Sequence, residues 1–150
     1  MKFYTGIGSR ETPIAIQKKM TLMARNLKEK GYILRSGAAE GADTAFEVGA
    51  GGFKEIWLPW PKFNGHQSQL LPSKEAFAMA AEFHPAWDRC SRGARALHAR
   101  NCHQVLGWDL KTPSEFILCW TKDGKASGGT GQAMRIAKAF NIPIYIVNDK

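Results

Sequence analysis

Short apolar runs alternate along this chain with longer segments in which apolar residues recur every three or four positions. The runs have the length of buried β-strands and cover residues 2–5, 32–35, 55–58, 116–120 and 144–147. Between the first two runs, one helical face is apolar and consists of Ile16, Met20, Met23 and Leu27. The pattern therefore predicts strands that are separated by helices with one buried face.

Residues that start and stop helices support this assignment. Thr12 is the expected N-cap of the first helix, with Pro13 at its first helical position and Gly31 at its end. A second, short helix is expected over residues 43–49, and two more over 73–83 and 85–107. The last helix follows the glycines of "SGGTGQAMRIAKAF" and ends before Pro143.

Strands that alternate with helices predict a parallel sheet, because parallel strands need crossover connections. We expect an α/β fold, Rossmann-like and doubly wound, with a mainly parallel five-stranded sheet. A helical insertion, at about residues 59–108, separates the third strand from the fourth. It is either a lid or wall of the site or an extension of the core. The whole chain, residues 1–150, is expected to form one domain.

The composition adds a basic charge to this picture. Lys and Arg number 21 and Asp and Glu 13, a formal net charge of +8. This charge favours polyanionic partners, although a basic, soluble surface explains it equally well. The cysteines are odd in number and lack a CxxC spacing; they are Cys90, Cys102 and Cys119. We therefore expect no disulfide framework, no metal site and no cofactor. With no signal-peptide or membrane-length apolar run, we expect a cytoplasmic protein and no membrane partner.

Three glycine-rich segments follow predicted strands: "TGIGSR", "SGAAEGAD" and "SGGTGQ". The carboxyl ends of parallel strands meet at one sheet edge, where Rossmann-like folds bind their ligands. Glycine turns let backbone amides approach an anion, and the helix that follows adds the positive end of its dipole. The three segments together predict a phosphate-binding pocket at this edge.

Each segment supplies candidate residues for this pocket. We expect the first segment to bind one phosphate through Gly8, Ser9 and Arg10, and the second to line the floor of the pocket with Ser36 and Gly37. The third segment is expected to cradle a second phosphate with Ser127, Gly128, Gly129, Thr130 and Gly131. Asp43 is expected to cap its helix or to orient Arg10 or Ser36. The glycine spacing fits neither the GxGxxG dinucleotide fingerprint nor the P-loop of ATPases.

The insertion is expected to add charge and aromatic surface to the pocket. On a continuous helix over 85–107, the side chains of Arg89, Arg92, Arg100 and His103 fall within a sector of roughly 80°. This sector predicts a basic stripe that extends a track for a polyanion. Trp60 and Trp87 are candidates for stacking on a base, although packing in the core explains such residues too.

Four motifs resemble one known family. "GIGSRETP", "LRSGAAEGADTAFE", "ARNCHQVLG" and "SGGTGQAMRIA" are similar to the DprA/Smf side of the SLOG superfamily, where such motifs build one phosphate-binding site. The resemblance implies that Arg100 and Asn101, the RN pair, belong to that site. It also implies a partner that is either single-stranded DNA or a nucleotide-derived molecule such as an ADP-ribose relative, and a homodimer or higher homo-oligomer.

The related LOG phosphoribohydrolases cleave the N-glycosidic bond of nucleotides, and their late motif reads PGGxGTxxE. In "SGGTGQAMR", Gln132 stands at the family's Thr, and Met134 and Arg135 at its acidic pair. Because glycosidic cleavage needs a carboxylate near the sugar, we predict a non-catalytic protein that binds a phosphorylated nucleotide-like ligand. DprA-like binding of single-stranded DNA is the first alternative, and LOG-like hydrolysis, with Glu40, Asp43 or Glu115 as substitute acids, is the second.

Overall fold

The protein is an α/β Rossmann-like fold with one five-stranded parallel sheet. A computed structural model describes residues 1–126 and 128–148. The sheet has the order β3-β2-β1-β4-β5, and every neighbouring pair is parallel. Its strands are β1 (Lys2–Gly6), β2 (Tyr32–Ser36), β3 (Lys54–Ile56), β4 (Ile117–Cys119) and β5 (Ile144–Ile146). The five predicted strands are therefore confirmed, with ends that differ by no more than two residues.

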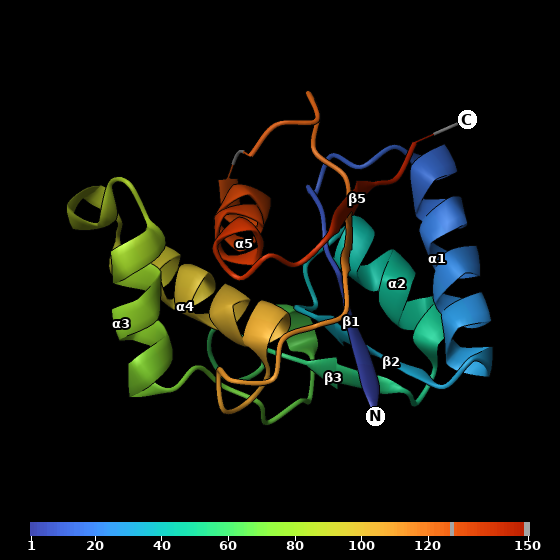
Figure 1. The fold of residues 1–150 in the computed structure, drawn as a ribbon, viewed down its shortest axis with the longest axis horizontal. Coiled ribbons are helices and arrows are strands. Elements are labelled where there is room, and N and C mark those ends of the chain that lie inside the picture. The colour runs from blue at the N-terminus through green and yellow to red at the C-terminus, as the bar shows by residue number, and fades with distance from the viewer. Residues whose placement is uncertain (127, 149–150) are drawn as a thin grey trace.

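Helices cover both faces of the sheet (Figure 1). One face carries α1 (Ile14–Glu29) and α2 (Ala42–Ala50), and the other carries α3 (Lys74–Phe83), α4 (Arg92–Leu106) and α5 (Gly128–Ala139). Each side has its own apolar core. Met20, Leu34 and Phe46 lie in the first, and Ala99, Ile117 and Ile136 in the second. None of the described helices has the length and apolar character that a membrane crossing requires.

Three local predictions about helix boundaries were wrong. Helix α1 begins at Ile14 with Pro13 as its N-cap, because the Thr12 hydroxyl instead donates to the Ser9 carbonyl at 2.5 Å. The predicted helix over 85–107 is interrupted: a 3-10 turn covers Trp87–Arg89, and α4 starts only at Arg92, where the Ser91 side chain accepts from the Ala94 amide. The glycines of "SGGTGQ" do not form a loop, because Gly128 through Gly131 belong to the first turn of α5.

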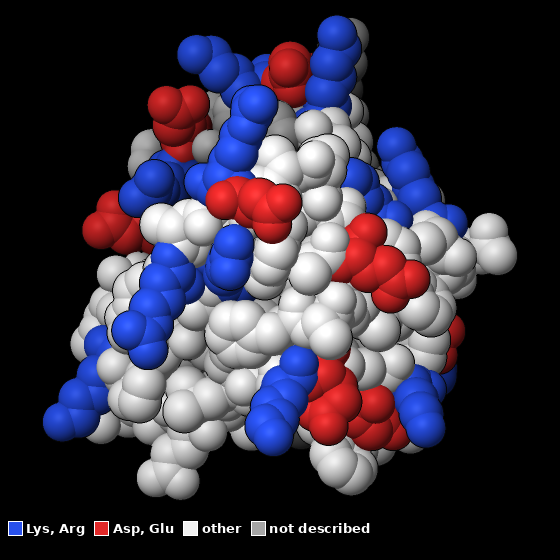
Figure 2. Space-filling view, turned by 90° about the vertical axis from the view of Figure 1, so that its left-hand side faces the viewer, with Lys and Arg blue, Asp and Glu red and all other residues white. Residues whose placement is uncertain are grey.

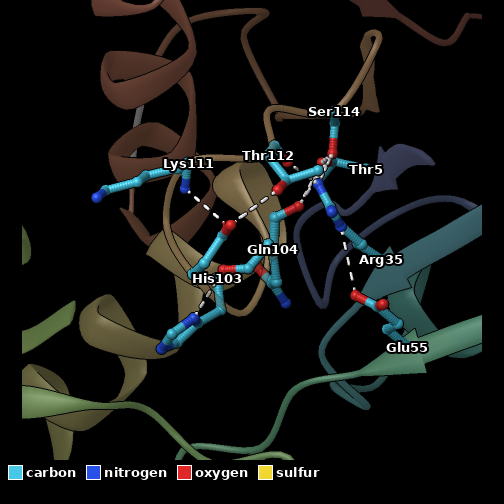
Figure 3. A network of polar contacts seen from close by, with 10 residues as sticks. Thr5, Arg35, Glu55, His103, Gln104, Lys111, Thr112 and Ser114 are labelled. Carbon is cyan, nitrogen blue, oxygen red and sulfur yellow. Dashed lines mark hydrogen bonds and ion pairs between the residues drawn. The ribbon is translucent and has the colours of Figure 1, made fainter. Parts of the chain in front are cut away.

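A buried polar network fixes α4 over the sheet (Figure 3). Arg35 is 1% exposed on β2, and its Nη1 donates to Thr112 O at 2.6 Å and to Ser114 Oγ at 3.2 Å. Thr5 Oγ1, on β1, donates to the backbone carbonyl of Gln104 at 2.5 Å. These bonds tie the end of α4 and the segment behind it to the two central strands. Residues 100–104 are thereby held against the sheet edge where the first two glycine-rich segments emerge.

Candidate functional site

A cavity of about 1060 Å³ lies at the carboxyl end of the sheet, between β1 and β4. It is lined by residues 7–11 after β1, residues 121–123 after β4, the start of α2, one side of α4 and the first turn of α5. The chain turns from β1 towards β2 on one side and from β4 towards β5 on the other. Such a reversal of strand order opens the crevice in which Rossmann-like folds bind ligands.

Arg100 lies in the wall of this cavity with its guanidinium fixed in place. Nη1 donates to the carbonyls of Gly37 at 2.6 Å and Trp57 at 3.1 Å, and Nε donates to Asn101 Oδ1 at 2.9 Å. Asn101 in turn donates from Nδ2 to Gly129 O, at 2.9 Å. Among the described residues Nη2 has no hydrogen-bond partner, and it is not sealed from solvent. One edge of a rigid cation is thus available to an anion.

Asp43 is the carboxylate that accompanies this cation. It is the second residue of α2 and does not cap the helix, because Gly41 precedes the first turn and Asp43 Oδ2 accepts from the Ala39 amide at 3.2 Å. Burial raises the pKa of Asp43 to about 6, while the Arg100 charge acts to lower it. Burial lowers the pKa of Arg100 to about 10, so Arg100 stays protonated at neutral pH. The charge of Asp43 acts on Arg100, and not on Arg10 or Ser36 as predicted.

The first glycine-rich segment and the first turn of α5 lie on two sides of the cavity. Gly8 and Ser9 line it, and the exposed Arg10 stands at its rim. A Cβ on Gly8 would lie 2.6 Å from Ala42 Cβ, so the two segments meet too closely for a side chain. Gly128, Gly129 and Thr130 line the cavity from α5. The first turn of a helix has amides without intrahelical partners, which suits an anion.

Three of the residues predicted from the glycine-rich segments, all of them described, do not reach the cavity lining. The Ser36 hydroxyl is buried and donates to Gly6 O at 2.6 Å. Gly37 lies beneath Arg100, where a Cβ would come within 2.5 Å of Arg100 Nη1. Gly131 is buried against Ala126. Ser127 is outside the described residues. Ser36 and Gly37 therefore support Arg100 from below, and the surface that a ligand would touch belongs to Arg100 itself.

The predicted basic stripe is wrong. Arg100 and His103 are 5% and 1% exposed, because α4 is packed between α3, α5 and the sheet. His103 Nδ1 is bonded to Gly107 O, its Nε2 accepts from Ser73 N, and its ring stacks on Trp57. Arg89 and Arg92 are exposed but line no part of the cavity. On the face that contains α3, basic side chains are interspersed with acidic ones (Figure 2).

The two candidate stacking residues lie in different places. Trp60 lines the cavity, is 42% exposed, and meets the Phe63 ring edge to face with centroids 5.3 Å apart. Trp87 lies in the 3-10 turn, where its ring packs against the second core and under the guanidinium of Arg95 at 5.1 Å. Only Trp60 of the two is therefore in a position to stack on a ligand in the cavity.

The residues that stand at the acidic pair of the hydrolases face away from the cavity. Gln132 Nε2 donates to Ala80 O on α3 at 3.1 Å, Arg135 Nη2 donates to Gln132 Oε1 at 2.8 Å, and Met134 lies in the second core. Their identity therefore has no bearing on what happens inside the cavity. The carboxylates that line it are Glu11, Asp43 and Asp123, and the absence of cleavage remains a prediction.

Sequence reasoning missed several lining residues, among them Gln104, Thr121, Lys122 and Asp123. The last three directly follow β4, so the rule that placed the glycine-rich segments at the strand ends would also have found them. Gln104 carried no such signal. It reaches the cavity because the turn of α4 that follows Arg100 lies against Gly37.

Comparison with known proteins gives a likeness in fold. No family model matches the chain, and no curated protein matches it. A solved structure of DNA processing protein A from Helicobacter pylori, described with a single-stranded DNA binding mode, matches with a TM-score of 0.57 and 15% identity. The match covers 97% of this chain and 64% of that one, so this chain spans under two thirds of the other protein's length. The likeness supports the DprA-like, Rossmann-like fold that the motifs predict.

Proposed function

We propose that this protein binds single-stranded DNA, with a backbone phosphate against Arg100 and the first turn of α5 and with a base on Trp60. The observation that carries the proposal is that a buried, rigid cation and an exposed indole ring line one cavity. A nucleotide unit has the matching pair of features, an anion and an aromatic face. Base stacking on aromatic side chains, combined with phosphate contacts, is the general mode of single-strand binding.

The phosphate contact rests on the hydrogen bonds around Arg100. Since Nε and Nη1 are held by Asn101, Gly37 and Trp57, the remaining Nη2 edge is already positioned and loses little entropy on binding. Gly128 and Gly129 line the same cavity at the start of α5, which is the positive end of that helix dipole. Arg10 and Lys122 at the rim are placed for the neighbouring phosphates of a strand.

Two further observations favour a strand over a free nucleotide. The chain carries a net charge of +8, and the solved structure with the similar fold is described as binding single-stranded DNA. A compact nucleotide ligand, with one or two phosphate groups and several hydroxyls, is the second candidate. It is favoured by the lining itself, where Arg10, Arg100 and Lys122 are matched by Glu11, Asp43 and Asp123, because carboxylates accept hydrogen bonds from sugar hydroxyls but repel a continuous backbone.

The two candidates differ in their dependence on salt and length. For single-stranded DNA we expect saturable binding of a fluorescein-labelled oligothymidine that strengthens with length and weakens with salt, with a log–log slope of about −0.7 per phosphate contacted. Fluorescence anisotropy at several salt concentrations measures both. Tight binding of a nucleoside monophosphate or of ADP-ribose by calorimetry, with oligonucleotides bound no better than their single units, would instead establish the second candidate.

Replacing Trp60 with alanine is expected to weaken oligothymidine binding by about five- to 150-fold, because stacking on one aromatic side chain contributes about 1–3 kcal/mol per base. The folded state should be little affected, since the ring is 42% exposed. Trp108→Ala is the matched control: Trp108 is 73% exposed and does not line the cavity, so its loss should leave affinity unchanged. Equal affinities of the two variants would refute the assigned role of Trp60.

A further inference from the structure

Two histidines and a cysteine converge at the far end of the helical segment, outside the cavity. His84 follows α3, Cys90 ends the 3-10 turn, and His98 lies in the second turn of α4. One donor atom from each side chain lies within 4.8 Å of the other two. Cys90 Sγ is 3.8 Å from His84 Nε2, and the two imidazole centroids are 4.4 Å apart. The three side chains come from three separate segments, so tertiary folding brings them together.

The cluster contains polar atoms that its surroundings leave unsatisfied. Nδ1 of His98 is shielded from solvent and has no hydrogen-bond partner among the described residues. Cys90 is a free thiol whose hydrogen-bond partners among the described residues are the His84 ring and the Ala86 carbonyl. A buried imidazole nitrogen without a partner is unfavourable, since it loses its hydration without replacement. A bound cation would supply the missing partner.

We propose that His84, Cys90 and His98 bind a Zn²⁺ ion, with water at the fourth position. Zn²⁺ prefers four ligands drawn from imidazole nitrogen and thiolate sulfur, which is the donor set present here. A tetrahedral ion with Zn–S of about 2.3 Å and Zn–N of about 2.0 Å holds sulfur and nitrogen about 3.5 Å apart. The Cys90–His84 separation of 3.8 Å requires a closure of a few tenths of an ångström, and the His98 nitrogen, which lies within 4.8 Å of the other two donors, must also move closer. His84 and Cys90 are half-buried, so a water molecule can reach the ion.

Some features around the cluster favour a bound cation, and others oppose it. Burial lowers the pKa of His98 to about 4, and the pKa of His84 is also lowered, so both imidazoles are neutral and free of competing protons at pH 7. The guanidinium of Arg135 acts on both rings and that of Arg100 acts on His98; both repel a cation, which a coordinated Cys90 thiolate would offset. Coordination also replaces or rearranges the hydrogen bond that His84 Nδ1 accepts from the Ala86 amide at 3.0 Å.

This site lies outside the proposed DNA-binding cavity, because none of its three residues lines the cavity, although the Arg100 charge acts on His98. His98 and Arg100 are two residues apart on α4, so their side chains leave the helix about 200° apart. The spacing H-x5-C-x7-H matches no common zinc motif, which is why the sequence predicts no metal. An ion at this position would link the end of α3, the 3-10 turn and the start of α4. It would therefore stabilise the outer helical segment without entering the cavity.

The test is a Zn²⁺ titration of the full chain after treatment with a chelator and under reducing conditions. We expect one equivalent to bind, measured by competition with a chromophoric chelator, and the melting temperature to rise with Zn²⁺ concentration. Cys90→Ser and His98→Ala should each weaken binding at least about tenfold. His66→Ala is the matched control, because His66 is also half-buried but lies outside the cluster and pairs with Glu47.

A second measurement keeps the proposal falsifiable if a variant folds poorly. Co²⁺ added to the wild-type chain should give a thiolate-to-cobalt charge-transfer band in the near ultraviolet and the visible bands of a tetrahedral ion. Both should disappear on addition of excess Zn²⁺. The absence of the charge-transfer band, or equal Zn²⁺ affinities for wild type, Cys90→Ser and His98→Ala, would overturn the proposed site.

Discussion

Replacing Arg100 with alanine is expected to lower the free energy of unfolding by about 3–5 kcal/mol and to abolish oligothymidine binding. The loss leaves the Gly37 and Trp57 carbonyls without their donor and Asp43 as an uncompensated buried carboxylate. The same change removes the rigid cation that we assign to the phosphate. Urea unfolding followed by circular dichroism measures the first effect, and anisotropy under conditions where the variant remains folded measures the second.

Two further variants separate charge from geometry at this position. Arg100→Lys keeps the charge, but an ammonium cannot reproduce a fork that contacts Gly37, Trp57 and Asn101 together, so we expect partial recovery of stability and little recovery of binding. Arg92→Ala removes an exposed arginine at the start of the same helix and should change stability by no more than about 0.5 kcal/mol. An Arg100→Ala protein that binds and unfolds like wild type would remove the basis of the site.

In Asp43→Asn, the free energy of unfolding is expected to rise relative to wild type by about 3 kcal/mol between pH 4 and pH 7.5, in addition to a pH-independent loss from leaving Arg100 without its carboxylate. Burial raises the pKa of Asp43 from 3.8 to about 6 in the folded state, and each pKa unit corresponds to 1.36 kcal/mol. The folded state therefore binds this proton more tightly than the unfolded state does. The contribution of Asp43 to stability is most favourable below about pH 4, falls as pH rises through 6, and is lowest above that value.

The measurement is the free energy of unfolding from pH 4 to pH 7.5 in wild type and in Asp43→Asn. Other titrating groups, such as Glu47 with its lowered pKa, are common to both proteins, so the difference between the two curves isolates Asp43. We expect the difference between the two curves to change by about 3 kcal/mol in favour of the variant as pH rises from 4 to 7.5. Parallel curves over the whole range would show that Asp43 is not buried as a carboxylate beside Arg100.

The sheet and the place of the site could be predicted from the sequence, whereas the surroundings of individual side chains could not. Apolar runs of strand length, such as the one at residues 32–35, leave few alternatives once helical segments separate them. Glycines after strands then locate the ligand-binding edge. Periodicity groups Arg100 with Arg92 on one side of a helix, but it cannot tell whether α3 and α5 cover that side. For this reason Arg100 and His103, two members of the expected surface stripe, are buried and hydrogen-bonded, whereas Arg89 and Arg92 are exposed.

The start of α4 and the His84, Cys90 and His98 cluster were unpredictable for a related reason. The segment before Ser91 looks helical by composition, yet the Ser91 hydroxyl accepts from Ala94 and begins a new helix there. The resulting turn folds Cys90 back towards His84.

The glycines before Gln132 were expected to form a loop, and Met134 and Arg135 were aligned with a catalytic pair on that basis. The glycines instead form the first turn of α5, and this helix directs Gln132 towards Ala80 on α3.

The sheet order has a consequence for the protein during its synthesis. The central strand, β1, is made before the other strands of the sheet and can pair with β2 as soon as α1 exists, but its other neighbour, β4, follows more than 100 residues later. The cavity needs residues 7–11 together with the first turn of α5, which is made more than 100 residues after them. A nascent chain can thus build the α1 and α2 side early while the cavity is still incomplete. Premature termination before residue 128 would yield a chain that acquires part of its core but lacks the wall of the cavity that α5 forms.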